Sequence, residues 1–299
     1  MNVSMLIVTR GMTPEVHALA RRLADLLGAA RSDTLTGEVL IVAENPRMAE
    51  VAEPELLGDG ITLVSIPAKQ GLGYNRNRAL EAAVGDTVVF VDDDCWPADD
   101  WLSELLAPLA DPTIQAVMGN VHIRPSTFVG DSISALGFPA GGSTGFAVMF
   151  PVDDEGFTTH ISTLNCALRD DTFVRVGPFD ESLVFGGEDG ELSHRISSAG
   201  LRVKFQPTAM VEHDARSSLP EFTRWFFRRG RAAYQFSRRV PAGGTIGRRL
   251  ASYTQILRMH RNDPKIVAIV PLLGASIVLQ QAGFAWEYVV GEESRDERD

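Results

Sequence analysis

The chain has 299 residues, of which 44% are hydrophobic and 22% are charged, and its formal net charge is −11. This hydrophobic share supports a sizeable core and excludes a disordered protein. The acidic balance argues against a general nucleic-acid binder, because such a protein needs a basic face for the phosphates.

The N-terminal half alternates short apolar runs with helical periodicity. Strands are predicted at residues 3–9, 38–43, 61–66 and 87–91, and helices from Pro14 onward and at 75–84 and 97–109. This alternation predicts a parallel sheet covered by helices, with ligands at the carboxyl ends of the strands. The first strand lacks the basic region and cleavage site of a signal peptide, so we expect a cytoplasmic location.

The second half has a less regular pattern. Residues 115–150 carry Gly and Pro interruptions that indicate no single element, whereas strands are predicted at 162–169, 201–205 and 209–211 and helices at 188–199 and 220–239. The only two cysteines are Cys95 and Cys166, and neither lies in a CxxC pair. We therefore expect a reducing compartment.

Three consecutive aspartates, Asp92, Asp93 and Asp94, directly follow the strand predicted at 87–91. Adjacent carboxylates repel one another and are costly to bury unless a cation is present. Mg²⁺ and Mn²⁺ prefer oxygen ligands and commonly bridge carboxylates to substrate phosphates. A solvated acidic turn, or the start of a helix before Pro97, is the alternative interpretation.

A second acidic pair, Glu188 and Asp189, follows two glycines and opens a predicted helix. The glycines allow a tight turn, and the helix dipole favours negative charge at this position. A carboxylate held there can act as a general base toward an attacking hydroxyl, or it can simply cap the helix. His213 follows a short predicted strand and is either structural or a metal ligand.

Several blocks, in this order, resemble the family 2 glycosyltransferases. The resemblance covers roughly residues 3–214 and rests on residues 3–9, 38–45, 71–77, 91–94, 164–169, 176–181 and 186–192. It implies an α/β fold of the GT-A type, which is Rossmann-like, with a mostly parallel sheet flanked by helices. It also implies transfer of a sugar from a nucleoside-diphosphate sugar to an acceptor hydroxyl, with inversion at the anomeric carbon.

The resemblance also assigns roles to individual residues. It implies that Asp189 is the catalytic base and that Glu188 orients it, and that Mn²⁺ or Mg²⁺ is bound at a DxD motif. The implied metal ligands are Asp92, Asp94 and His213, and the implied nucleotide-sugar contacts are Thr9, Glu44, Arg76, Asn77, Asp92 and Asp93. Glu44 stands where the family usually has an aspartate for the nucleotide base. A UDP-sugar is the favoured donor, and the acceptor stays open among a glycan, a lipid-linked molecule and a small molecule.

The predicted domains are a catalytic domain at 1–215, a basic and aromatic helical extension at 216–264, and an apolar segment with an acidic tail at 265–299. Aromatic and arginine side chains mixed over 220–239 suit an anionic membrane surface or packing on the main domain. The apolar run at 266–290 has three interpretations: a membrane span, a helix lying on the membrane, or a homodimer contact. We expect association with the inner face of the cell membrane.

Three other functions use a similar sheet. A sugar nucleotidyltransferase needs a Gly-rich basic loop after the first strand, to which residues 9–13 are a thin match. A phosphatase or phosphotransferase with an Asp nucleophile would need a different residue pattern after Asp94. A catalytically inactive nucleotide-sugar-binding protein would not need Glu188 and Asp189.

Overall fold

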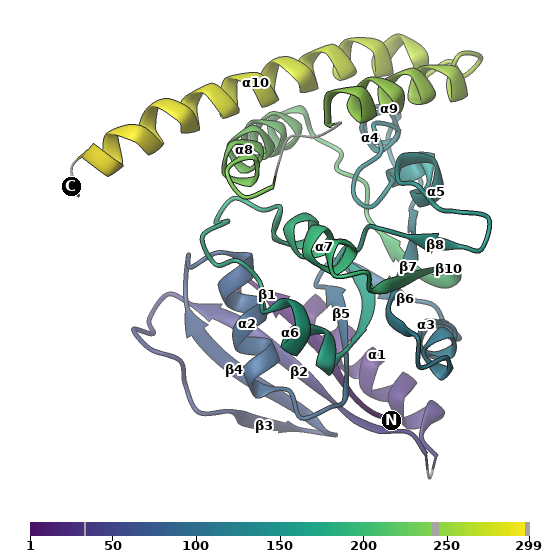
Figure 1. Ribbon diagram of the computed structural model, residues 1–299, viewed down its shortest axis with the longest axis vertical. Coiled ribbons are helices and arrows are strands. Elements are labelled where there is room, and N and C mark those ends of the chain that lie inside the picture. The colour runs from purple at the N-terminus through teal and green to yellow at the C-terminus, as the bar shows by residue number, and fades with distance from the viewer. Residues whose placement is uncertain (33, 241–244, 297–299) are drawn as a thin grey trace. The chain divides into compact units, whose positions relative to one another are not determined.

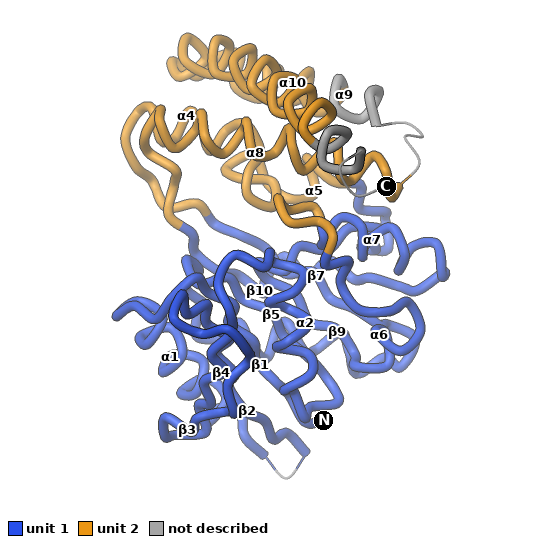
Figure 2. Tube along the Cα trace, turned by 90° about the vertical axis from the view of Figure 1, so that its left-hand side faces the viewer, with its two compact units in different colours: residues 1–122, 151–181, 188–213 blue, residues 123–150, 182–187, 214–299 orange. Residues whose placement is uncertain are grey.

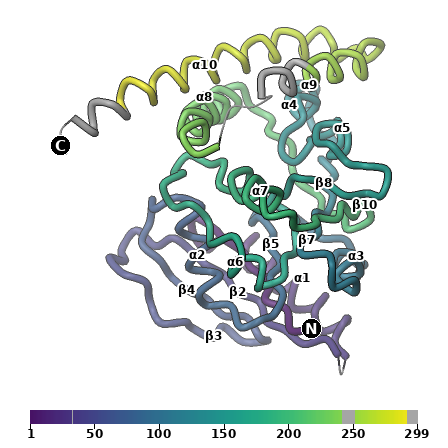
Figure 3. The backbone as a smooth tube through the Cα atoms, viewed as in Figure 1, coloured from purple at the N-terminus to yellow at the C-terminus, as the bar shows by residue number. Residues whose placement is uncertain are grey.

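The computed structural model describes residues 1–32, 34–240 and 245–296, which form two compact units (Figure 2). Unit 1 comprises Met1–His122, Pro151–Glu181 and Glu188–His213, and unit 2 comprises Ile123–Phe150, Ser182–Gly187 and Asp214–Asp299. Each unit therefore draws on three separate stretches of chain, which can be followed by colour in Figure 3.

Unit 1 is built on a mixed sheet, which has ten strands in the part of the chain that the structure describes (Figure 1). The strand order is β3-β4-β2-β1-β5-β9-β7-β10-β6, and β8 pairs with β10. The strands are β1 (Asn2–Thr9), β2 (Thr36–Asn45), β3 (Glu55–Gly58), β4 (Ile61–Pro67), β5 (Thr87–Asp92), β6 (Cys95–Pro97), β7 (Ile114–Ile123), β8 (Phe157–Thr158), β9 (Asn165–Arg169) and β10 (Arg202–His213).

The predicted α/β fold is confirmed, but the sheet is mixed rather than mostly parallel, because β4, β2, β1 and β5 pair in parallel with one another whereas β3, β6, β8 and β9 pair antiparallel with their neighbours. Leu6 at the centre of β1 lies between Leu40 of β2 and Phe90 of β5, and all three side chains are buried. Beyond β5, strand β9 pairs antiparallel with both β5 and β7, and Phe90 lies opposite Cys166. The strand–helix alternation that parallel pairing requires ends in the sequence near residue 110, and the direction of pairing changes accordingly.

Helices flank this sheet, and their bounds are α1 (Pro14–Ala30), α2 (Leu72–Ala82), α3 (Trp101–Leu106), the 3₁₀ turn η1 (Ala107–Ala110), α6 (Asp170–Val176) and α7 (Glu188–Ser198). In α1 the Thr13 side chain accepts a hydrogen bond from the Val16 amide, and Pro14 occupies the first turn. The predicted apolar stripe of α1 is buried, as its spacing requires.

Two element predictions are wrong because long-range pairing overrides local pattern. The strands expected at 201–205 and 209–211 form one strand, β10, which continues through Pro207 where the chain is exposed. The helix expected from Pro97 begins only at Trp101, because Cys95–Pro97 pairs with β10 as β6. Backbone pairing with a distant segment leaves little trace in local periodicity.

The boundaries of α2 and one edge strand also differ from the predictions. The helix expected at 75–84 begins three residues earlier, at Leu72, and ends two residues earlier, at Ala82. The strand β3 was not predicted and pairs antiparallel with β4. Its residues are exposed, with Leu56 at 71%, so it has no buried face to give it a periodic signal.

Unit 2 is helical and has a core of its own. Its helices are α4 (Phe128–Ser134), the 3₁₀ turn η2 (Gly142–Thr144), α5 (Phe146–Met149), α8 (Leu219–Ser237), α9 (Thr245–Met259) and α10 (Ile266–Asp296). The buried core residues are Ile133, Ala135, Leu136, Phe222, Phe226, Ile256, Ile269 and Leu273. Helices α4, α8, α9 and α10 all contribute to this core, so they fold together as one body.

Both cysteine thiols are expected to resist alkylation in the folded protein. Cys95 and Cys166 are 3% and 0% exposed and form no disulfide, and burial raises the pKa of Cys166 well above its usual range. Titration with Ellman's reagent should find no rapidly reacting thiol in buffer and two after denaturation. A fast-reacting thiol in the native protein would contradict the buried placement.

Candidate functional site

Three of the predicted site residues lie where parallel strands end. Thr9 closes β1 opposite Ala43 of β2, and Val8 pairs with Asp92, the last residue of β5. Glu44 follows Ala43 directly. The sheet therefore brings Thr9, Glu44 and Asp92 to one edge, which is where α/β sheets bind their ligands.

The three consecutive aspartates form the turn between β5 and β6. Burial raises the pKa of Asp92 to about 6, although the Arg76 guanidinium opposes this effect, and the charges of Asp94 and Asp93 add to it. Burial also raises the pKa of Asp93, and a hydrogen bond with the Thr9 side chain opposes that shift. This turn therefore holds negative charge that its surroundings only partly compensate.

His213 lies beside Asp94 because β10 pairs with β6. His213 stands opposite Cys95 in that ladder, and its Nε2 is 3.1 Å from Asp94 Oδ2. The histidine is 4% exposed, whereas the Asp94 side chain is 52% exposed. The His213 imidazole and the Asp94 carboxylate, which are 119 positions apart in the chain, thus lie in contact beside the carboxyl end of β5.

The described residues do not include a group of three His, Cys, Asp or Glu side chains already arranged around one metal position. Of the predicted ligands, Asp94 and His213 are in contact, and Asp92 lies two residues away in the same turn. Mg²⁺ and similar ions often use one or two carboxylates and complete their shell with water and substrate phosphate. The donors and the excess negative charge of this turn fit such an ion.

Arg76 connects the two acidic blocks. It lies on α2, is 4% exposed, and its Nη1 donates to Glu188 while its Nη2 is 3.5 Å from Asp92 Oδ1. Glu188 is 112 positions from Arg76 in the chain. One buried guanidinium thus lies between the end of β5 and the start of α7.

Glu188 and Asp189 have different environments at the start of α7. Glu188 is 3% exposed, burial raises its pKa against the effect of Arg76, and its Oε2 has no hydrogen-bond partner. Asp189 is partly exposed, and its Oδ1 accepts from the Gly190 amide. The preceding Gly186 and Gly187 have φ of 113° and 96°, so the tight turn expected there is present.

Glu44 and Asn77 are held by different partners. Glu44 accepts from Asn75 Nδ2 at 2.9 Å and from the Lys69 amide at 3.2 Å, which fixes its carboxylate at the strand edge. Asn77 instead exchanges two hydrogen bonds with the Phe179 backbone and donates to Glu181. Both ends of the Asn77 amide thus bond to the 179–181 segment. The structure therefore does not bring this amide to Asp92, Glu188 or Asp189.

Asn75 was missed by the sequence interpretation. It is fully buried, it positions Glu44, and its Oδ1 has no hydrogen-bond partner. A signal was available, because asparagine is unfavourable inside a helix and a polar residue there often has a specific partner.

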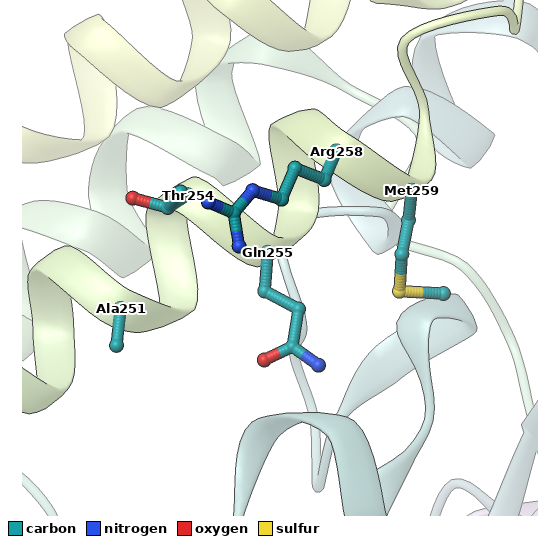
Figure 4. Close-up of a pocket in the computed structure, with 5 residues that line it drawn as sticks. All are labelled: Ala251, Thr254, Gln255, Arg258 and Met259. Carbon is teal, nitrogen blue, oxygen red and sulfur yellow. The ribbon is translucent and has the colours of Figure 1, made fainter.

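A separate hollow lies on unit 2 and is lined by side chains of α9 alone (Figure 4). Its residues are Ala251, Thr254, Gln255, Arg258 and Met259. None of them is acidic and none belongs to the strand edge, so this hollow is distinct from the site described above.

Comparison with known proteins decides the family. Residues 14–140 match the model for glycosyl transferase family 2. The succinoglycan biosynthesis protein ExoM of Rhizobium meliloti is 30% identical over 234 residues, which are 75% of this chain and 68% of that protein. This chain belongs to glycosyltransferase family 2. The pre-mycofactocin glycosyltransferase of Mycobacterium tuberculosis is 29% identical over 192 residues, 63% of this chain, and the chain spans 40% of the length of that relative.

Solved structures confirm the GT-A fold expected for family 2. A mannosyltransferase from Pyrobaculum calidifontis, in complex with GDP-Man and Mn²⁺, has a TM-score of 0.54 at 19% identity, covering 96% of this chain and 83% of its own. GalNAc-T7 with UDP, GalNAc and Mn²⁺ has a TM-score of 0.52 at 15% identity, covering 87% of this chain and 57% of its own. At these identities the likeness concerns the fold.

Proposed function

We propose that this family 2 protein transfers a sugar from a nucleoside-diphosphate sugar to an acceptor hydroxyl. The observation that carries the proposal is the buried Arg76, which holds Asp92 on one side and Glu188 on the other. Arg76 thus joins the end of β5, which we assign to the nucleotide, to Glu188 and Asp189 at the start of α7. Transfer with inversion needs both groups, because the leaving group and the attacking hydroxyl are then on opposite sides of the sugar.

The leaving-group side comprises the three aspartates and His213. We assign Asp94, Asp92 and His213 to a divalent cation, Mn²⁺ or Mg²⁺, bound as a DxD motif. When bound, the ion supplies positive charge to the departing diphosphate. His213 Nε2 lies 3.1 Å from Asp94 Oδ2, so these two donor atoms are already close enough together to bind one ion.

The attacking side comprises Asp189 as the general base and Glu188 as the residue that orients it. Asp189 is the more exposed of the two, so an acceptor hydroxyl can reach it. Glu188 is fixed by Arg76, which keeps the first turn of α7 in position. A base acting on the face opposite the leaving group gives inversion at the anomeric carbon.

The nucleotide is assigned to Thr9, Glu44, Arg76, Asp92 and Asp93. Asn75 and the Lys69 amide hold the Glu44 carboxylate at the strand edge, where we assign it to the base of the nucleotide. Asn77 bonds to the Phe179 backbone and so supports the neighbouring segment of the site. We favour a UDP-sugar. GalNAc-T7 and a mycobacterial glucosyl-3-phosphoglycerate synthase were solved with UDP or UDP-glucose, whereas the Pyrobaculum calidifontis mannosyltransferase was solved with GDP-Man, so the assay below compares both donor classes. The acceptor class stays open among glycans, lipid-linked molecules and small molecules.

We further propose that residues 1–215 carry the reaction and that 216–264 and 265–299 hold the protein at the inner face of the cell membrane. The segment Ile266–Val290 is long and apolar enough to cross a membrane by length and composition alone. ExoM, whose name places it in bacterial glycan synthesis, supports this location in a general way.

Removal of divalent metal is expected to abolish nucleotide release from the donor. The purified chain should be incubated with UDP- and GDP-sugars, and free UDP or GDP measured with Mn²⁺, with Mg²⁺ and with EDTA. Asp94→Asn should behave like the EDTA sample, because it removes the charge that binds the ion, whereas the exposed Asp25→Asn on α1 should behave like wild type. Undiminished release in EDTA by both wild type and Asp94→Asn would overturn the metal assignment.

A further inference from the structure

Helix α10 has apolar residues on its exposed face as well as on its buried face. Its buried positions are Ile269, Leu273, Ser276, Gly283 and Glu287, at intervals of four, three, seven and four residues. Ile269 and Leu273 belong to the unit 2 core and Leu279 packs against it, whereas Ser276, Gly283 and Glu287 are polar or lack a side chain. A helix docked in water normally turns its apolar residues inward and its polar residues outward.

The inward polar residues are satisfied within unit 2. Glu287 accepts from Arg231 Nε at 2.7 Å and from Gln235 Nε2 at 3.2 Å, both on α8. Ser276 Oγ donates to the Leu273 carbonyl at 2.7 Å, within α10. This face of α10 therefore packs against α8 and cannot bind another partner.

Two glycines hold α8 and α10 in close contact. A Cβ at Gly230 would lie 2.1 Å from the Gln280 carbonyl oxygen, and one at Gly283 would lie 2.0 Å from the Phe227 carbonyl oxygen. Only glycine fits at both positions, so the two helices meet backbone to backbone. This contact fixes one face of α10 against α8, so the opposite face is the one turned outward.

The opposite face of α10 is apolar and exposed. We define the outer face of α10 by Val267, Val270, Val278, Trp286 and Val289, which are 73%, 52%, 68%, 55% and 54% exposed. Their spacing places Val267, Val278 and Val289 on one line along the helix. Leaving five large apolar side chains in water is unfavourable by the ordinary hydrophobic effect, so this face needs an apolar partner.

The charge around α10 selects a lipid surface over a second copy of the chain. Residues 219–265, which precede α10, contain ten arginines and one lysine against two acidic residues, whereas residues 287–299 contain six acidic residues against two arginines. The attraction to an anionic surface is therefore expected at the N-terminal end of α10. Arg224, Arg238, Arg258 and Arg261 are exposed. Two copies meeting at this face would bring their basic segments together, whereas anionic lipid headgroups attract them.

The link between α10 and α8 favours a helix lying in the membrane plane. For α10 to cross the bilayer, the bond of Glu287 with Arg231 would carry α8 with it, together with Arg228 and Arg229. Charged side chains at the centre of a bilayer are costly. We propose that α10 binds the surface of an anionic bilayer through its outer face as a peripheral helix, an inference that rests on the membrane association proposed above.

The test is sedimentation of the full chain with vesicles of phosphatidylcholine alone and of phosphatidylcholine mixed with phosphatidylglycerol. We expect binding to the mixed vesicles and weaker binding to phosphatidylcholine alone. The double variant Val267→Glu/Val278→Glu should lower the affinity by about tenfold or more, because it places two charges on the outer face. Val174→Glu on α6, where the valine is 82% exposed, is the matched control and should bind like wild type.

Three outcomes would overturn the inference. The first is equal vesicle binding by wild type and the double variant. The second is absence of vesicle binding together with a dimer, seen by analytical ultracentrifugation, that the double variant abolishes. The third is retention of the vesicle-bound protein after alkaline carbonate extraction, as for a spanning helix. Nucleotide release from the donor, measured on the same samples, is independent of all three and tests the proposed transfer separately.

Discussion

Replacing Asp189 by asparagine is expected to lower kcat for sugar transfer by about 10²–10⁴-fold, the usual contribution of a general base. Asparagine keeps the size of the side chain and its acceptor oxygen toward the Gly190 amide, but it cannot take a proton from the acceptor. KM for the donor should change little, because the residue acts on the acceptor side. Steady-state kinetics of nucleotide release, with the donor that the release assay above selects, give both constants.

The matched control for this variant is Asp171→Asn. Asp171 is an exposed acidic residue in the first turn of α6, the same position in its helix that Asp189 has in α7. The Asp171→Asn variant should keep the wild-type kcat. Comparison of the two variants then separates base catalysis from a general effect of charge at the start of a helix. Wild-type turnover by Asp189→Asn would remove Asp189 from the reaction.

Replacing Arg76 by methionine is expected to cost about 3–5 kcal/mol of folding stability, as is typical when one partner of a buried ion pair is removed. Arg76 and Glu188 have side chains only 5% and 4% exposed, so the remaining carboxylate would be buried without its partner. Chemical denaturation monitored by tryptophan fluorescence measures the free energy of unfolding. A value within experimental error of wild type would contradict the pairing.

The double variant Arg76→Met/Glu188→Leu should recover a large part of that loss, because neither charge then remains buried without a partner. It should stay inactive, since α7 then lacks the contact that orients its first turn toward Asp92. Arg76→Lys keeps the charge but not the planar fork, so its stability should lie between those of Arg76→Met and wild type. This series separates the contribution of the ion pair to stability from its role in positioning.

The sequence reveals the site where the information is local. Asp92, Asp93 and Asp94 follow a buried apolar run, and Glu188 and Asp189 follow two glycines, so each block could be assigned to a strand end or a helix start. The α/β class and the parallel core strands could be predicted for the same reason. The resemblance to family 2, carried by short blocks in order, agrees with the match over residues 14–140.

The sequence does not reveal what depends on pairing between distant segments. The contact of His213 with Asp94 requires β10 to lie antiparallel to β6, and neither that register nor the continuity of β10 has a local signature. The same holds for Arg76, whose two carboxylate partners come from different elements. Asn77, which family resemblance assigned to the nucleotide, is engaged by a backbone segment a hundred residues away.

The interleaving of the two units limits how this protein could be divided. The chain leaves unit 1 at Glu181, passes through Ser182–Gly187 in unit 2, and returns to form the helix that carries Asp189. That short passage is held by α8, since Arg228 donates to the Phe185 and Val184 carbonyls. Truncation after His213 would therefore remove the support of the very loop that introduces the proposed base. Exchange of the whole of unit 2 between homologues would require crossovers at the five points where the chain passes between the units, so unit 2 and the proposed site are expected to have been inherited together.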